Sequence, residues 1–188
     1  RILALTVMLA SRCGYSADLS AAVNGRALCH VDNAYFLEHV EIVSHRCKTH
    51  TVSNTAFRGF GAPQAMMVIE HVIDDIARTL RIDPLDVRRA NFYGIGERDT
   101  TYYGQVVADN VIHEIADQLE ASSAYRARRV AVSQWNALNS VIKRGLALTP
   151  VKFGISFTAT HYNQAGALVH VYADGTVLLN HGGTEMGQ

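Results

Sequence analysis

An apolar pattern with helical spacing dominates the middle of the sequence and limits what the chain can fold into. From residue 64 to residue 80, apolar side chains recur every three or four residues, at Met66, Ile69, Ile73, Ile76 and Leu80. This spacing places them on one face of an α-helix, and Pro63 stands where proline favours the first helical turn. We therefore predict an amphipathic helix over 64–80 whose apolar face needs a core to cover it.

Extended segments are predicted on both sides of this helix. Residues 2–11 and 34–49 are rich in β-branched side chains and alternate weakly, which is typical of strands and predicts a β-rich first part. Residues 146–158 are apolar and β-branched, and they predict a further strand. Residues 168–172 and 176–179 flank an Asp-Gly pair, which is a strong hairpin signal.

Two more helices are predicted after the long one. Asp83 and Pro84 form a good helix start, which predicts a short helix as far as residue 91. Residues 93–105 are rich in turn-forming residues and predict a subdomain boundary or a long connection. Residues 109–138 read as helix with an interruption near residues 122–123. The pattern as a whole predicts an α+β fold, with mixed sheets and packed helices.

The balance of charge excludes several classes of partner. With 17 basic and 17 acidic side chains among 188 residues, the chain has no basic field to hold nucleic acid or an anionic membrane. Apolar residues make up 48% of the sequence, which suits a packed core and not a disordered chain. No apolar run is long enough to span a bilayer, so we expect a soluble, cytoplasmic protein.

The ends of the sequence indicate an internal segment of a longer polypeptide. The chain begins at Arg1 without the features of a signal peptide, and it stops within a glycine-rich turn at residues 182–188. Three widely spaced cysteines favour reduced thiols over a metal cluster or a disulfide framework.

One candidate site is the stretch 53–64, Ser-Asn-Thr-Ala-Phe-Arg-Gly-Phe-Gly-Ala-Pro-Gln, which ends where the long helix begins. Its glycines allow the backbone to approach a ligand, and the start of a helix favours an anion or an electron-rich oxygen. The alternative is an ordinary turn, with Arg58 in solvent and the two phenylalanines in the core.

The second candidate site is the glycine-rich end, residues 182–188, where polar side chains follow the predicted hairpin. Such a loop suits close contact with a polar cofactor, although a plain turn also explains it. It is not a nucleotide-binding fingerprint, because it lacks the Gly-x-Gly-x-x-Gly spacing. None of the nine histidines has the spacing of a zinc motif, and no serine or cysteine lies in a nucleophile motif.

Several motifs accompany these two stretches, and together they cover the chain nearly from end to end. They lie at 26–35 (RALCHVDNAY), 47–49, 53–64, 152–158 (KFGISFT), 163–168 and 181–188. On these motifs the chain resembles the molybdenum-binding region of the xanthine dehydrogenase and xanthine oxidase branch of the molybdenum hydroxylase family. Aldehyde oxidases of that family usually lack an arginine matching Arg26 and depart from KFGISFT. The resemblance therefore favours a purine substrate.

The resemblance implies parts of two molybdopterin-binding domains, the C-terminal part of one over 1–95 and the N-terminal part of the next over 96–188. It implies an oxidoreductase that hydroxylates hypoxanthine and xanthine to urate at a molybdenum-molybdopterin centre, with water as the source of oxygen. Two 2Fe-2S clusters, FAD and NAD as the acceptor would belong to other segments or subunits of an oligomeric parent enzyme. We therefore expect this segment to be inactive alone.

The resemblance also implies roles for individual residues in substrate binding. Arg26 would be both a catalytic and a substrate-binding residue, since it would orient the purine through its oxygen. Phe60 and Phe157 would sandwich the planar ring, and Thr158 would contact it. We expect the loops that carry Arg26, Phe60 and Phe157 to converge.

On the cofactor side, the resemblance implies that Arg58, Gly187 and Gln188 bind molybdopterin, with Arg58 near the molybdenum but not a ligand of it. The family's catalytic glutamate would lie beyond Gln188. A second substrate-binding glutamate and a cofactor-binding glutamine would precede the segment. Ala62 replaces a glycine that is common in the family, which the turn tolerates if the φ angle of Ala62 is negative.

Two alternatives remain open from the sequence. Within the same family, the chain fits an aldehyde oxidase or another N-heterocycle hydroxylase. Outside it, the region of Phe60 and Phe157 fits a non-catalytic module that binds a small ligand.

Overall fold

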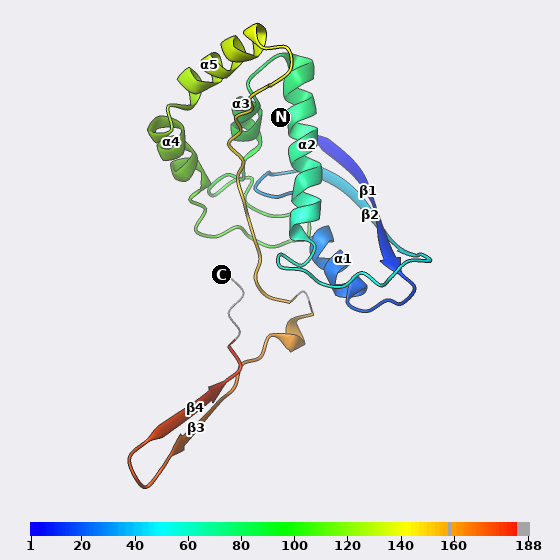
Figure 1. The fold of residues 1–188 in the computed structure, drawn as a ribbon, viewed down its shortest axis with the longest axis vertical. Helices are drawn as coiled ribbons and strands as arrows, with labels where there is room; N and C mark the ends of the chain where they lie inside the picture. The colour runs from blue at the N-terminus through cyan, green and yellow to red at the C-terminus, as the bar shows by residue number, and fades with distance from the viewer. Residues whose placement is uncertain (158, 184–188) are drawn as a thin grey trace.

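The computed structural model describes residues 1–157 and 159–183, which form an α+β fold as predicted. A long helix, α2, lies between a two-stranded sheet on one side and a group of three helices on the other, and a β-hairpin projects from the far end (Figure 1). Extended loops connect these parts. The loop before α2 and the segment that follows α5 meet at the N-terminal end of α2, near α1 (Figure 1).

The first part of the chain is a β-α-β unit. Strands β1 (Ala4–Gly14) and β2 (His39–Lys48) pair in parallel, and helix α1 (Ser20–Leu28) connects them. Both strands were predicted, although the second begins later than expected. The first part, predicted as β-rich, also contains α1, which the sequence did not predict. The buried positions of α1 include Ser20 and Asn24, so the helix presents no apolar stripe to recognise.

The predicted long helix is α2 (Ala62–Leu80), which begins two residues earlier than the apolar pattern does. One face of it is completely buried, and the members of that face are Ala62, Ala65, Ile69, Ile73 and Ala77. Of the predicted apolar positions only Ile69 and Ile73 belong to this face, whereas Met66 and Ile76 are half-buried and Leu80 is 61% exposed. The small alanines let β1 and α1 pack closely against α2.

Helix α3 (Pro84–Asn91) starts as the sequence predicted, because the Asp83 carboxylate accepts a hydrogen bond from the Leu85 N–H at 2.9 Å. Its Arg88 side chain is almost fully buried against α2. The guanidinium pairs with Glu70 at 2.8 Å and with Asp74 at 2.9 Å. A buried arginine is stable only when its donors are satisfied, so these two carboxylates fix α3 on α2.

The predicted third helical region is also interrupted where expected. Residues 112–138 form α4 (Ile112–Ser122) and α5 (Tyr125–Leu138). Between them Ala124 adopts the left-handed conformation, with φ of 49°, and this ends the hydrogen-bonded run. Arg126 of α5 pairs with Glu120 of α4 and with Asp86 of α3, which ties the three helices together.

The prediction of a strand over 146–158 is wrong for the residues that the structure describes there. This segment has the extended backbone of a strand but pairs with none, and it runs from α5 back toward α1 (Figure 1). We call residues 148–157 the strap. An apolar, β-branched sequence favours an extended backbone, but a strand also needs the edge of a sheet as its partner.

The predicted hairpin is confirmed. Strands β3 (Ala167–Val171) and β4 (Val177–His181) pair antiparallel and follow a short 3-10 helix, η1 (Thr160–Tyr162). Gly175 in the turn has a φ of 84°, and the Asp174 carboxylate accepts from the Thr176 N–H at 2.9 Å. The glycine thus supplies the positive φ angle of the turn, and the aspartate side chain binds a backbone N–H within it.

Candidate functional site

Arg26 lies on α1 and not on a loop, which corrects one expectation. Its side chain points at the strap, where the guanidinium donates to the backbone carbonyls of Gly154, Ile155 and Ser156. The residue is only 6% exposed, and burial lowers the pKa of the guanidinium. Nε is buried without a hydrogen-bond partner among the described residues, so one donor remains unused.

The structure brings Arg26, Phe60 and Phe157 together, and we call these three residues the ring-contact site. The Arg26 guanidinium carbon lies 5.8 Å from the centre of the Phe60 ring. The centres of the Phe60 and Phe157 rings are 5.9 Å apart, and the ring planes are nearly perpendicular, at 83°. With this spacing the two rings touch each other, so a planar ligand would need them to separate before lying between them.

A glycine turn just before α2 holds Phe60 in place. Gly59 and Gly61 have φ angles of 92° and 98°, and Phe60 between them has 54°. A side chain on Gly61 would lie 2.1 Å from the Val23 carbonyl oxygen of α1, so only glycine fits there. Ala62 begins α2 and does not have a positive φ angle, so the turn tolerates alanine where the family commonly has glycine.

Among the described residues, Arg58 is a predicted site residue that does not belong to this cluster. Arg58 is exposed at the start of the glycine turn, and no ion pair or hydrogen bond of its guanidinium occurs within residues 1–157 and 159–183. Thr158, Gly187 and Gln188 lie outside the described residues.

Sequence reasoning missed His30, which the structure places beside the cluster. His30 follows α1 and is 5% exposed. Its Nδ1 lies 2.8 Å from the Arg26 carbonyl oxygen, and its Nε2 accepts from the Gly154 N–H at 3.0 Å. Burial, reinforced by the nearby Lys152 and Arg26 cations, lowers the pKa of His30. The only sequence signal was its place in the RALCHVDNAY motif.

The strap has a second anchor next to His30. Lys152 forms an ion pair with Asp32, which also accepts from the Tyr93 hydroxyl. Asn33 binds the strap backbone twice, through the Pro150 carbonyl at 2.9 Å and the Lys152 N–H at 3.1 Å. Burial raises the pKa of Asp32 despite the cation beside it. The segment after α1 therefore recognises the strap through polar contacts along much of its length.

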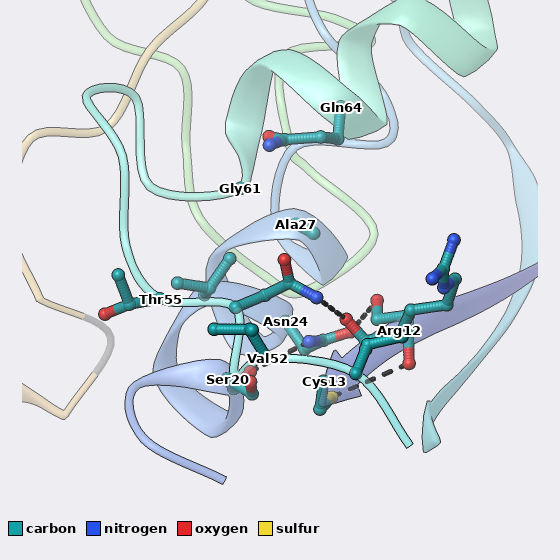
Figure 2. A pocket seen from close by; sticks show the side chains of 13 residues that line it. Arg12, Cys13, Ser20, Asn24, Ala27, Val52, Thr55, Gly61 and Gln64 are labelled. Atoms are coloured by element: carbon teal, nitrogen blue, oxygen red, sulfur yellow. Dashed lines mark hydrogen bonds between the residues drawn. The ribbon is translucent and has the colours of Figure 1, made fainter. Parts of the chain in front are cut away.

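A separate cavity of about 700 Å³ opens between the end of β1, helix α1 and the loop over 51–61 (Figure 2). Asn54 closes part of its wall by donating to the Arg12 carbonyl at 2.6 Å. Gly61 and Gln64 from the predicted motif line it, whereas no residue of the ring-contact site does. The motif over 53–64 thus borders both the cavity and the ring-contact site.

Neither a metal site nor a membrane span is found in the described part of the chain. Its histidine, cysteine, aspartate and glutamate side chains form no group of three that would hold a metal ion. None of its helices combines the length and the apolar composition needed to cross a membrane.

Two models of a molybdopterin cofactor-binding domain match the sequence, one over residues 1–92 and the other over residues 118–188. Among curated proteins, xanthine dehydrogenase of Dictyostelium discoideum is 46% identical over 187 residues. Nicotinate hydroxylase of Emericella nidulans is 47% identical over 190 residues. Each alignment covers 100% of this chain, which spans 14% of the length of either relative.

Among solved structures, the aldehyde oxidoreductase from Desulfovibrio desulfuricans has the same fold, with a TM-score of 0.71 and 23% sequence identity. The match covers 94% of this chain and 19% of that one. The two domain models match residues 1–92 and 118–188, and the alignments with the curated relatives cover the whole of this chain. The chain belongs to the molybdenum hydroxylase family, within its molybdopterin cofactor-binding region.

Proposed function

We propose that the chain is part of a xanthine dehydrogenase, which hydroxylates hypoxanthine and xanthine to urate. In each hydroxylation water supplies the oxygen, and the substrate loses two electrons, which pass finally to NAD. The observation that carries this proposal is the ring-contact site, where an arginine and two perpendicular aromatic rings meet from distant parts of the sequence. A cation beside an aromatic face and an aromatic edge suits a flat heterocycle with an electron-rich oxygen.

The residues before α2 fit an anionic cofactor such as molybdopterin. Arg58 presents an exposed cation at a glycine turn whose two left-handed glycines keep the backbone free of side chains. Guanidinium and backbone N–H groups are the donors that phosphate binds best. When bound, the molybdenum centre supplies the oxygen-transfer and electron-transfer chemistry. We assign Arg58, Gly187 and Gln188 to holding it.

The chain's own residues bind and orient the substrate. Phe60 and Phe157 contact the purine ring, and Thr158 supplies a polar contact at its edge. Arg26 faces the purine oxygen and stabilises the negative charge that grows there as the ring is attacked. Since Arg26 is also anchored to the strap, its position is fixed before the substrate arrives.

The remaining components belong to the rest of the enzyme. We assign residues 1–95 to the C-terminal part of one molybdopterin-binding domain and residues 96–188 to the N-terminal part of the next. The 2Fe-2S clusters and FAD lie in other segments or subunits of an oligomeric, cytoplasmic enzyme. Turnover requires these other components, so we expect the segment to be inactive when it is expressed alone.

A second candidate is hydroxylation of another N-heterocycle, and one observation favours it. The relative from Emericella nidulans, similar over the whole segment, is named a nicotinate hydroxylase. Nicotinate is also flat, but its oxygens belong to a carboxylate attached to the ring, whereas the oxygens of a purine such as xanthine are bonded directly to ring carbons. A small aldehyde substrate has no flat ring for the two phenylalanines to contact. Binding of a ligand without turnover stays an alternative, which the molybdenum content and the activity of the full-length protein test.

The test is to purify the full-length protein, measure its molybdenum content, and compare kcat/KM for xanthine, nicotinate and a small aldehyde. We expect molybdenum near one atom per chain and the highest kcat/KM with xanthine. Preference for nicotinate would replace the proposal with the second candidate. Absence of molybdenum from protein produced with an adequate molybdenum supply would overturn the enzyme assignment.

A further inference from the structure

His30 has a protonation state that its two partners determine. The Gly154 N–H can only donate, so His30 Nε2, 3.0 Å away, must accept. The Arg26 carbonyl can only accept, so Nδ1, 2.8 Å away, must carry the proton. The imidazole is therefore neutral, with its proton on Nδ1. It joins the end of α1 to a strap glycine that lies far away in the sequence.

The same glycine is held from its other side by Arg26. The Gly154 carbonyl accepts from the Arg26 guanidinium, while the Gly154 N–H donates to His30. Both polar groups of this one peptide position are thus bound to α1 and the residues just after it. The Phe153 ring also packs against both partners, 5.3 Å from the His30 ring and 5.3 Å from the Arg26 guanidinium carbon.

Phe157 lies three residues beyond this anchor. It is 47% exposed, and its contacts with Phe60 and Tyr162 are made edge to face. The backbone next to it is held by Arg26 through the Ser156 carbonyl and by Asn163, which binds Phe157 N–H at 2.8 Å. Since little else packs around the Phe157 ring in the described residues, its position depends on where the strap is fixed.

We propose that His30 is a positioning residue for the ring-contact site: by accepting from the Gly154 N–H it fixes the strap and sets Phe157 and the Arg26 guanidinium in place. The effect on substrate binding rests on the proposed function, whereas the effect on the strap does not. His30 touches no substrate in this arrangement. It acts through Gly154 and through the carbonyl of Arg26.

Two substitutions test the hydrogen bonds of Nε2 and Nδ1 separately. In His30→Gln the side-chain oxygen reaches the place of Nε2, so it still accepts from the Gly154 N–H. In His30→Asn the shorter amide donates to the Arg26 carbonyl but cannot reach Gly154. His71→Asn serves as the control, because His71 is an exposed histidine on α2 whose ion pair is with the exposed Asp75 of the same helix. All three variants are made in the full-length protein.

Two readouts are measured, namely amide hydrogen exchange of peptides from the strap and from α2, and the kcat and KM for xanthine. We expect exchange in the strap of His30→Asn to be on the order of fivefold faster, the effect of losing one hydrogen bond. KM should rise by a similar factor with little change in kcat. His30→Gln should stay near the wild type in both readouts, and His71→Asn should be unchanged.

Equal behaviour of the Gln and Asn variants would overturn the proposal, as would an unchanged strap in His30→Asn. Faster exchange in α2 as well as the strap would also overturn it, because His30 would then support the core. If the wild type fails to turn over xanthine, the proposed function fails, and the exchange of the strap still decides the role of His30.

Discussion

Helix α2 and the strap are both apolar in sequence, yet they are held in the fold by opposite means. The apolar face of α2 is fully buried against strands and helices. In the strap, Val151 and Ile155 are 69% and 63% exposed, and the backbone is bound by polar side chains from the region of α1. A helix satisfies its own backbone, so burial alone secures it, whereas an unpaired extended segment must find donors and acceptors elsewhere.

The largest effect should come from removing an apolar side chain from α2. Ile73 is completely buried, so Ile73→Ala should destabilise this part of the protein by about 2–5 kcal/mol through lost burial and a cavity. The measurement is urea unfolding of the full-length protein, followed by hydrogen exchange of peptides from α2. Met67→Ala on the exposed side of the same helix should change little. Equal losses in the two variants would mean that the face buried by α2 is wrongly assigned.

Arg26→Met should have the next largest effect, and it acts on catalysis. Loss of a cation that stabilises charge developing on the purine oxygen should lower kcat/KM for xanthine on the order of 100- to 1000-fold. A small aldehyde has no second oxygen at a distance from the carbon that is attacked, so its turnover should be little affected. Steady-state kinetics with both substrates, on enzyme with full molybdenum content, measures the difference.

The structure sharpens this prediction, because Arg26 also binds the strap carbonyls. If Arg26 were only an anchor, Arg26→Met would lower xanthine and aldehyde turnover by the same factor. Hydrogen exchange of the strap should quicken in either case, so exchange alone does not separate the two roles. The substrate dependence does.

The same comparison explains how much of the fold was predictable. Helix α2, the capped start of α3, the break between α4 and α5, and the β3–β4 hairpin all have local causes in the sequence, such as an apolar pattern, Asp83, or an Asp-Gly turn. Helix α1 and the unpaired strap depend on distant partners. Asn24 of α1, for example, is buried because it binds Ser11 and Ser44 of the two strands.

For the site, recognition of motifs gave Arg26, Phe60 and Phe157, and the structure brings the three together. No pattern in the sequence gave the role of His30 or Asp32. Both lie in a recognised motif, but their partners Gly154 and Lys152 are more than a hundred residues away, and only the folded chain shows the pairs. Motifs therefore name residues, whereas contacts separate those that touch a ligand from those that hold the site.

Phe157→Ala should have a smaller effect than Arg26→Met, confined mainly to binding. In the proposed function the ring contacts the substrate equally before and during the reaction, so its loss should raise KM for xanthine about five- to tenfold with a smaller change in kcat. The strap backbone should keep its hydrogen exchange, because its anchors lie at Gly154 and Lys152. A large fall in kcat with unchanged KM would show that Phe157 does more than bind.

The smallest predicted effect is a loosening of the strap in acid. Burial lowers the pKa of His30 below its ordinary value of 6.5, so the anchored state holds His30 neutral while a released strap would let it take up a proton. The contribution of His30 to the stability of the anchored strap is therefore complete above about pH 6.5, and it is lost progressively as the pH falls toward the lowered pKa of His30. A protonated Nε2 cannot accept from the Gly154 N–H, which is the contact that fails.

The charged groups that face His30 are Arg26, Lys152 and Asp32. Burial raises the pKa of Asp32, but its contact with Lys152 of the strap lowers that pKa, so protonation of Asp32 in acid also weakens the strap. His30→Gln removes the histidine contribution and keeps that of Asp32, which makes it the matched control. Strap exchange, corrected for the intrinsic effect of pH, should rise a few-fold in the wild type between about pH 7.5 and about pH 5.5. It should rise less in His30→Gln, which keeps only the contribution of Asp32. A parallel rise in both proteins would assign the acid sensitivity to another group and leave the His30 contact without a measurable share in holding the strap.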